Sequence, residues 1–250
     1  MPFDLTGKTA FVTGATSGLG RHFAHVLARS GCDVAISGRR RERLEELKLE
    51  LSAAGCRSVA VTLDVTEASS LPVALDEAER QIGPIHILVN NAGMNVQSAA
   101  VDLDPEGFDQ VMGTNLRGPF LLATEVARRM IARGGGGRII NIASIGAFRV
   151  LPGLTAYCMS KAGIAMMTQC LAREWARYGI NVNSICPGYI ETELNQDWFR
   201  SEAGRAQVKS FPRRQLMREE DLDDMLLLLA SDSSAAVTGA LLTVDDGQSL

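Results

Sequence analysis

Short apolar runs alternate along the chain with longer segments in which apolar residues recur every three or four positions. The short runs are typical of buried strands, and the longer segments are typical of helices with one buried face. The predicted strands cover 8–13, 33–37, 58–63, 86–90, 138–143, 181–185 and 240–244. The predicted helices cover 18–30, 40–54, 68–82, 105–132, 155–178 and 218–231. This alternation predicts a parallel sheet covered by helices on both faces.

The alternation runs through the whole chain without a proline- or serine-rich linker, and the glycine run at 134–137 is expected to be a loop. We therefore predict one α/β domain over residues 1–250, built on a Rossmann-type, doubly wound parallel sheet. An apolar content of 46% over 250 residues is sufficient for one large core. In such a fold, ligands bind at the carboxyl ends of the strands.

Charge and composition exclude several kinds of protein. A net charge of −4 is not that of a general nucleic-acid binder. The longest apolar run, 225–230, is too short to cross a membrane, and the first residues lack the apolar region of a signal peptide. The five cysteines are scattered, without the spacing of a disulfide framework or a zinc site. We expect a cytoplasmic protein with no metal, no nucleic-acid partner and no membrane association.

A glycine-rich turn joins the first predicted strand to the first predicted helix. It reads Thr13-Gly14-Ala15-Thr16-Ser17-Gly18-Leu19-Gly20. Glycines at these positions permit a tight turn and a close approach of the backbone to a pyrophosphate, and the helix N-terminus offers free N–H groups. A purely structural turn is the alternative, but the position between strand and helix favours a nucleotide site.

Tyr157 and Lys161 are four residues apart in a predicted helix, so their side chains share one face. A free phenol has a pKa near 10 and exchanges protons poorly at neutral pH. A neighbouring cation favours the phenolate and lowers that pKa, as general acid–base catalysis requires. Two such residues at helical spacing also occur as an ordinary solvated pair, and the nucleotide site is what favours the catalytic interpretation.

These motifs resemble those of the short-chain dehydrogenase/reductase family, in its short, single-domain branch, over essentially the whole chain. The resemblance rests on the order and spacing of Thr13-Gly14-x-x-x-Gly18-x-Gly20, Asn90-Asn91-Ala92-Gly93, Asn115, Ser144, Tyr157-x-x-x-Lys161 and Pro187-Gly188. It implies an oxidoreductase that interconverts an alcohol and a carbonyl with a nicotinamide cofactor. It also implies a homotetramer.

The resemblance implies a role for each matching residue. Tyr157 would exchange the proton, Lys161 would lower the phenol pKa and hold the nicotinamide ribose, and Ser144 would bond the substrate oxygen. Asn115 would hold a water linked to Lys161, although a polar helix residue often simply faces solvent. Cofactor contacts are expected from Gly14, Thr16, Ser17, Gly18, Leu19, Gly20, Arg39, Asp64, Val65, Asn91, Ala92, Gly93, Tyr157, Lys161, Pro187, Gly188, Ile190 and Thr192. Asp64 could instead cap the turn at Thr66.

The end of the second predicted strand bears on the choice of cofactor. NAD sites usually place an acid there, but this chain has Gly38 followed by Arg39. An arginine can bind a 2′-phosphate through charge-assisted hydrogen bonds, so NADP(H) is favoured and NAD(H) stays possible. We expect Arg40, Arg41 and Arg43 to be solvated residues at the start of a helix.

The segment 191–214, which contains Trp198, Phe199 and Phe211, has the composition of a lid over the substrate. Its five cationic residues could attract an acyl thioester or could be solvated surface. They are Arg200, Arg205, Lys209, Arg213 and Arg214. The family that the chain resembles includes 3-oxoacyl thioester reductases, so we predict a 3-oxoacyl thioester or related ketone as the substrate. The alternatives are an NAD-dependent alcohol, polyol or sugar dehydrogenase and an inactive nucleotide-binding protein, which the intact Ser144, Tyr157 and Lys161 disfavour.

Overall fold

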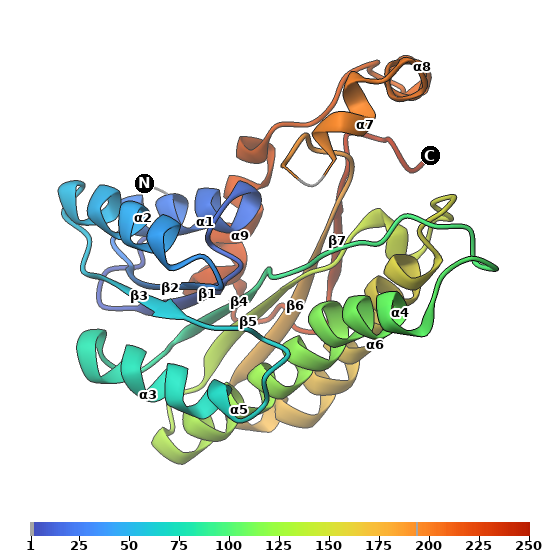
Figure 1. Ribbon diagram of the computed structural model, residues 1–250. Coiled ribbons are helices and arrows are strands. Elements are labelled where there is room, and N and C mark those ends of the chain that lie inside the picture. Colours follow the sequence, from blue (N-terminus) through green and yellow to red (C-terminus); the bar gives the residue numbers. More distant parts are fainter. Residues whose placement is uncertain (1–2, 194) are drawn as a thin grey trace.

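A computed structural model describes residues 3–193 and 195–250 (Figure 1). Its seven parallel strands are β1 Thr9–Thr13, β2 Asp33–Gly38, β3 Ser58–Thr62, β4 Ile87–Asn90, β5 Gly137–Ile142, β6 Ile180–Pro187 and β7 Leu241–Val244. They lie in the order β3-β2-β1-β4-β5-β6-β7. The order reverses between β1 and β4, which makes their carboxyl ends the switch point of the sheet. The predicted Rossmann-type fold is confirmed.

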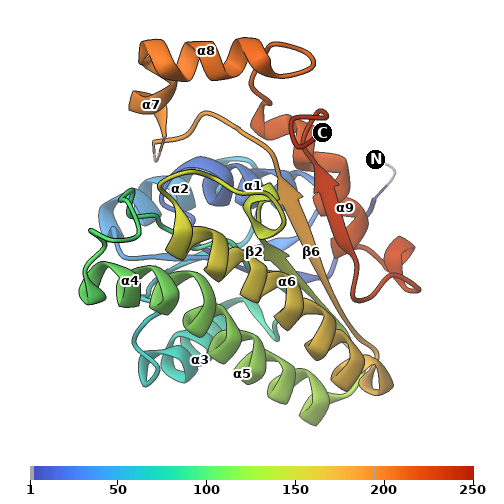
Figure 2. The ribbon, with the colours of Figure 1, turned by 90° about the vertical axis from the view of Figure 1, so that its right-hand side faces the viewer.

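Helices cover the sheet on both faces (Figures 1 and 2). One face carries α1 Gly18–Arg29, α2 Arg41–Ala53 and α9 Asp223–Ala230. The other carries α3 Ser70–Ile82, α5 Gly118–Arg133 and α6 Thr155–Trp175. Strand residues alternate between the two cores: Phe11 packs with α3 and α5, whereas Ala10 and Val12 pack with α1 and α2. Because side chains alternate between two covered faces, the strands are mostly apolar along their length.

The predicted helix 105–132 is divided in three. It consists of α4 Pro105–Met112, a π-helical turn Gly113–Arg117 and α5. A π-turn inserts one extra residue and rotates the side chains that follow, so sequence periodicity alone does not reveal it.

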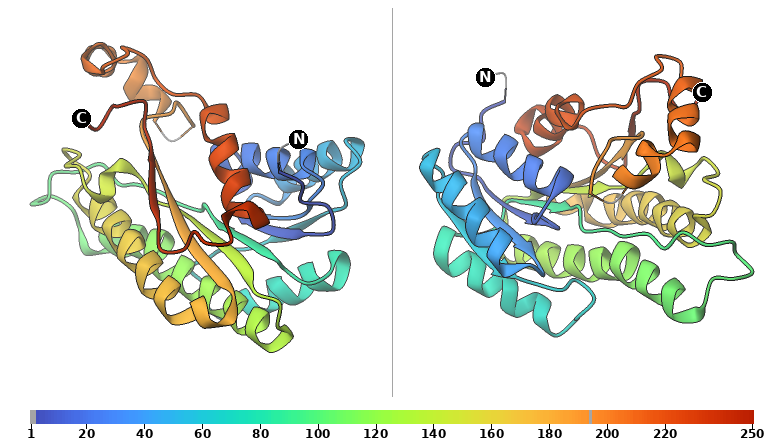
Figure 3. Two further views of the ribbon diagram at one scale, coloured as in Figure 1. Left: turned by 180° about the vertical axis from the view of Figure 1, so that it is seen from behind. Right: turned by 45° about the horizontal axis from the view of Figure 1, so that its top comes forward.

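The segment 191–214 stands out from the sheet beside its carboxyl edge, with α7 Gln196–Arg200 and α8 Glu202–Ser210 (Figures 2 and 3). Phe199 and Phe211 are buried against Tyr189: the Phe211 ring stacks on it at 5.3 Å, and the Phe199 ring meets it edge-on at 5.8 Å. Aromatic packing of this kind fixes the segment over the strand ends.

Three findings concern the expected absences. Within residues 3–193 and 195–250, no helix combines the length and apolar character needed to cross a bilayer. The same residues contain no group of three His, Cys, Asp or Glu side chains that could hold a metal ion. All five cysteines carry free thiols.

Candidate active site

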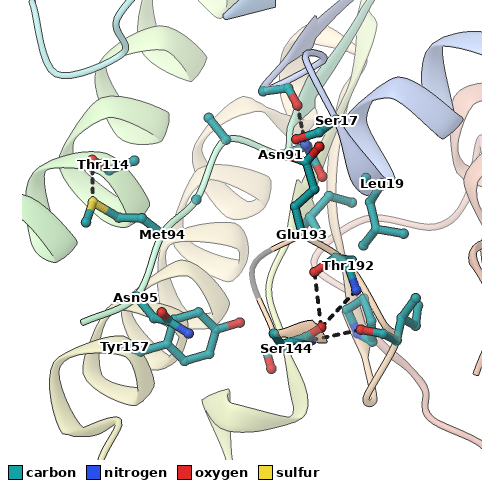
Figure 4. A pocket seen from close by; sticks show the side chains of 18 of the residues that line it. Ser17, Leu19, Asn91, Met94, Asn95, Thr114, Ser144, Tyr157, Thr192 and Glu193 are labelled. Atoms are coloured by element: carbon teal, nitrogen blue, oxygen red, sulfur yellow. Dashed lines mark hydrogen bonds between the residues drawn. The ribbon is translucent and has the colours of Figure 1, made fainter. Parts of the chain in front are cut away.

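A cavity of about 950 Å³ lies over the carboxyl ends of the central strands. It extends from the glycine-rich turn after β1, past the loop after β4, to Ser144 and Tyr157 (Figure 4). Of the residues predicted to form the site, all but Gly20 and Asn115 line this cavity. Residues from seven separate stretches of sequence therefore face one space.

The glycine-rich turn is shaped to take a phosphate group. A Cβ atom at Gly20 would lie 2.3 Å from the carbonyl oxygen of Gly14, and one at Gly14 would lie 2.8 Å from the Cα of Ala92. Only glycine therefore permits this packing. Ser17, at the N-terminus of α1, makes no side-chain capping bond, so the first N–H groups of the helix stay free for an anion. This cradle fits the pyrophosphate of a dinucleotide.

Two loops are locked together beside the cradle. The Thr13 hydroxyl oxygen accepts the backbone N–H groups of Asn91 and Ala92, each at 3.0 Å, and the Asn91 side-chain amide donates to the Thr13 carbonyl at 3.0 Å. Asn90 instead points into the sheet, where its amide donates to Asn141 Oδ1 at 3.0 Å. Asn90 thus joins strands, and Asn91 shapes the cavity wall.

The carboxyl ends of β2 and β3 bring a cluster of charged side chains to the end of the cavity that contains the glycine-rich turn. The Arg39 side chain is 74% exposed, and its nearest acidic partner is Asp64, at 3.8 Å. Asp64 also accepts the backbone N–H and hydroxyl of Thr66, at 3.0 and 2.8 Å. It therefore caps the turn as well as lining the cavity, and Val65 lies beside it.

The prediction that Arg40 is only a solvated residue at the start of a helix is wrong. Its guanidinium group donates to the Thr16 hydroxyl from Nε at 3.0 Å and from Nη2 at 2.8 Å, and Nη2 also donates to the Ser17 hydroxyl at 2.7 Å. The side chain folds back over the glycine-rich turn because Thr16 and Ser17 offer oxygen acceptors there. Sequence spacing does not indicate these contacts, because Arg40 is 23 positions from Ser17 and 24 positions from Thr16.

The candidate catalytic group lies at the opposite end. Ser144 follows β5, and its hydroxyl oxygen accepts the N–H of Gly146 at 3.0 Å. Tyr157, in the first turn of α6, hydrogen-bonds the Ser144 side chain, and Figure 4 shows its hydroxyl directed toward Ser144. One turn later Lys161 is 5% exposed, and its Nζ donates to the Ile142 carbonyl at 2.8 Å.

Burial dominates the protonation of this group. It raises the pKa of Tyr157, and the bond from Ser144 opposes that rise. Burial also lowers the pKa of Lys161 from 10.5 to about 8. The Lys161 ammonium is 5.5 Å from the centre of the Tyr157 ring. The lowering of the phenol pKa that we predicted from Lys161 is not seen in the protein alone.

Asn115 is buried, with 1% exposure, and does not face solvent. The π-turn directs its amide at the loop after β4: Nδ2 donates to the Met94 carbonyl at 2.8 Å and to Ser160 Oγ at 3.1 Å, and Oδ1 accepts the Met94 N–H at 2.8 Å. Asn115 therefore ties this loop to α6 behind the cavity. Its predicted role in holding a water stays a prediction.

The end of β6 and the loop that follows it complete the wall. Pro187, Gly188, Ile190 and Thr192 line the cavity, as expected for contacts to the nicotinamide end. The Thr192 backbone N–H donates to Asn195 Oδ1 at 2.8 Å, which fixes the start of the 191–214 segment.

Sequence reasoning missed several polar residues that line the cavity. The Trp198 indole N–H donates to Gln207 Oε1 at 2.7 Å, and the Gln207 side chain also bonds that of Tyr189. Asn95 and Gln97 line the other side, with Asn95 next to the Tyr157 ring in Figure 4. Asn95, Gln97 and Tyr189 come from loops, whereas Trp198 and Gln207 come from α7 and α8. No motif marks any of these positions.

The doubly wound sheet, its phosphate cradle and the buried phenol define a protein of the nucleotide-dependent oxidoreductase class. A family model described as short chain dehydrogenase matches residues 8–203. The chain belongs to this family, as its motifs predicted, and is an oxidoreductase.

Several proteins are similar to this chain over nearly their whole length. An NAD-dependent glycerol dehydrogenase of Listeria innocua is 36% identical, over 99% of this chain and 96% of the relative. A 2-dehydro-3-deoxy-D-gluconate 5-dehydrogenase of Escherichia coli is 36% identical, over 98% and 96%. The crystal structure of a gluconate 5-dehydrogenase from Burkholderia cenocepacia in complex with NADP and tartrate has 36% identity and a TM-score of 0.94, with coverage of 98% and 96%.

Proposed function

We propose that the protein is an NADP(H)-dependent dehydrogenase that interconverts a secondary alcohol and a ketone in a small, neutral, polyhydroxylated substrate. The observation that carries this proposal is one continuous cavity, with arginines beside the phosphate cradle at one end and Tyr157 among neutral polar side chains at the other. The relatives that act on glycerol and on gluconate derivatives support the choice of an alcohol substrate.

The residues divide the chemistry by position. Gly14, Gly18 and the N-terminus of α1 would hold the pyrophosphate, and Lys161 would hold the nicotinamide ribose. When bound, the nicotinamide supplies or accepts the hydride. Tyr157 donates a proton to the carbonyl oxygen during reduction and removes it from the alcohol during oxidation. Ser144 donates a hydrogen bond to that oxygen and stabilises its developing charge.

The preference for NADP(H) rests on the β2 end. Gly38 stands where an acid would bond the ribose hydroxyls of NAD, and Arg39 and Arg40 follow it directly. Arg40 already lies against Thr16 and Ser17. A 2′-phosphate there would meet two cations. The similar gluconate 5-dehydrogenase that holds NADP supports this preference, whereas the NAD-dependent glycerol dehydrogenase keeps NAD(H) as the second candidate.

The substrate end favours a neutral molecule. Among the described residues that line the cavity, the charged ones other than Lys161 are Arg39, Arg40, Asp64 and Glu193, and all four belong to the cofactor end. Asn95, Gln97, Tyr189 and Gln207 offer neutral donors and acceptors that suit hydroxyl groups. A carboxylate there would lose water and meet no cation besides Lys161, which the nicotinamide ribose would engage.

The preference for 3-oxoacyl thioesters gains no support. The cationic residues of the 191–214 segment do not line the cavity: Arg200 faces Glu191 at 3.7 Å, and Arg213 pairs with Asp246 at 2.9 Å. All five are exposed surface residues, as the alternative interpretation of the sequence predicts.

A substrate panel with both cofactors tests the proposal. We expect kcat/KM for threitol or glycerol to exceed that for gluconate by at least about tenfold, since an unpaired buried charge costs at least 1.4 kcal/mol. We also expect faster turnover with NADP⁺ than with NAD⁺. A preference for gluconate would contradict the neutral pocket, and faster turnover with NAD⁺ would contradict the cofactor assignment.

We also propose assembly as a homotetramer through α5 and α6. Their outer faces expose Phe120, at 44%, and Met166, at 60%, together with Met159. Exposed large apolar side chains on neighbouring helices are typical of subunit interfaces.

A further inference from the structure

Glu193 connects the 191–214 segment to the start of α2. Its carboxylate accepts hydrogen bonds from Arg40 Nη1 at 3.2 Å and from Arg43 Nη1 at 2.6 Å. The two guanidinium groups lower the pKa of Glu193, so the carboxylate is charged at neutral pH. Figure 4 shows Glu193 extending from this loop toward Ser17. The Glu193 carboxylate therefore pairs with two of the arginines at the cofactor end of the cavity.

The donors of Arg40 are almost fully engaged. Nε and Nη2 bond the hydroxyls of Thr16 and Ser17, and Nη1 bonds Glu193. A guanidinium group carries five N–H donors in a fixed plane. Thr16 and Ser17 belong to the glycine-rich turn and orient the guanidinium group. A phosphate can therefore form a paired contact with Arg40 only by using Nη1, which Glu193 already bonds.

We propose that Glu193 competes with the 2′-phosphate of the cofactor for Arg40 and Arg43, and so acts as a specificity-determining residue of the cofactor site. This inference rests on the proposed function, because it takes the end of β2 as the 2′-phosphate site. A nucleotide that carries the phosphate displaces the carboxylate and detaches the 191–214 segment from α2. A nucleotide that lacks it leaves both ion pairs in place.

The competition moderates the cofactor preference. Both ion pairs are about half exposed, so each contributes little, and a doubly charged phosphate replaces them readily. The displacement nevertheless reduces the affinity for the phosphorylated cofactor and leaves the affinity for the other unchanged. Glu193 therefore reduces the difference in affinity between NADP(H) and NAD(H).

Nucleotide fragments test this without any turnover. Adenosine 2′,5′-bisphosphate and adenosine 5′-monophosphate are titrated by calorimetry into the wild type and Glu193→Gln. We expect the variant to bind the bisphosphate roughly threefold to tenfold more tightly, the range for two exposed ion pairs. Its affinity for the monophosphate changes by less than about twofold.

Glu191→Gln is the matched control. It removes the same charge from the same loop, but Glu191 faces Arg200 and makes no ion pair with Arg40 or Arg43. We expect its affinities for both nucleotides to match those of the wild type. The proposed competition would be wrong if Glu193→Gln bound both nucleotides more tightly by the same factor. It would also be wrong if the affinity for the bisphosphate did not change.

The wild type distinguishes this inference from the proposed function. If the wild type prefers the bisphosphate and Glu193→Gln does not differ from it, the competition fails and the cofactor assignment stands. If neither protein discriminates between the fragments, the assignment of the 2′-phosphate site fails as well.

Discussion

Tyr157→Phe is expected to reduce kcat by about 10³ while nucleotide binding stays within about threefold of the wild type. The change removes one hydroxyl, which bonds Ser144, and leaves the buried ring in place. With no proton donor at the substrate oxygen, reduction would have to develop an alkoxide that only Ser144 stabilises. Steady-state rates and fluorescence titration with NADPH measure the two quantities.

Tyr178→Phe is the matched control, because it makes the same chemical change outside the cavity. Tyr178 follows α6 and lies beneath the guanidinium group of Arg177, 4.7 Å from the ring centre. We expect its kcat to equal that of the wild type. Retention of more than about a tenth of wild-type turnover in Tyr157→Phe would show that another group moves the proton.

Lys161→Met is expected to abolish turnover and to make the protein more stable. Burial lowers the pKa of Lys161 from 10.5 to about 8, so at pH 7 the folded protein holds a buried charge at a cost of roughly 3 kcal/mol. The substitution removes that cost and loses one hydrogen bond to Ile142, worth about 1 kcal/mol. We expect a net gain of about 2 kcal/mol in the free energy of unfolding at pH 7.

The gain should shrink as the pH rises. Because the folded-state pKa lies below the unfolded value, the unfolded wild type binds more protons between pH 8 and 10.5, and wild-type stability increases there. Urea unfolding of the protein without nucleotide at pH 7 and pH 9.5 measures the difference. Lys48→Met, on the partly exposed side of α2, should give no comparable gain. A destabilised Lys161→Met at pH 7 would mean that Lys161 is a structural residue.

The fold and most of the cavity could be predicted because their signals are local. Apolar runs gave all seven strands, and Gly14, Gly18 and Gly20 stand in one turn where steric space requires them. The contact from Arg40 to Ser17 could not be predicted, since it depends on how the end of β2 lies over the turn after β1. No local pattern distinguishes a guanidinium group that folds back from one that faces water.

The burial of Asn115 could not be predicted from the sequence, and neither could the residues at the substrate end of the cavity. A π-turn rotates Asn115 inward, and the regular period of a helix does not anticipate it. Gln207 and Tyr189 meet only because the 191–214 segment folds back on the loop after β6, and their identities match no fixed motif. We therefore expect residues that a motif search does not find to determine substrate specificity.

A crystal structure of the protein with NADPH tests the central claim most directly. We predict that the pyrophosphate lies on Gly14 and Gly18, and that the nicotinamide ring faces the Tyr157 hydroxyl across a space for one substrate oxygen. A nucleotide bound elsewhere, or a Tyr157 hydroxyl turned away from the ring, would contradict the claim that this phenol exchanges the proton during hydride transfer.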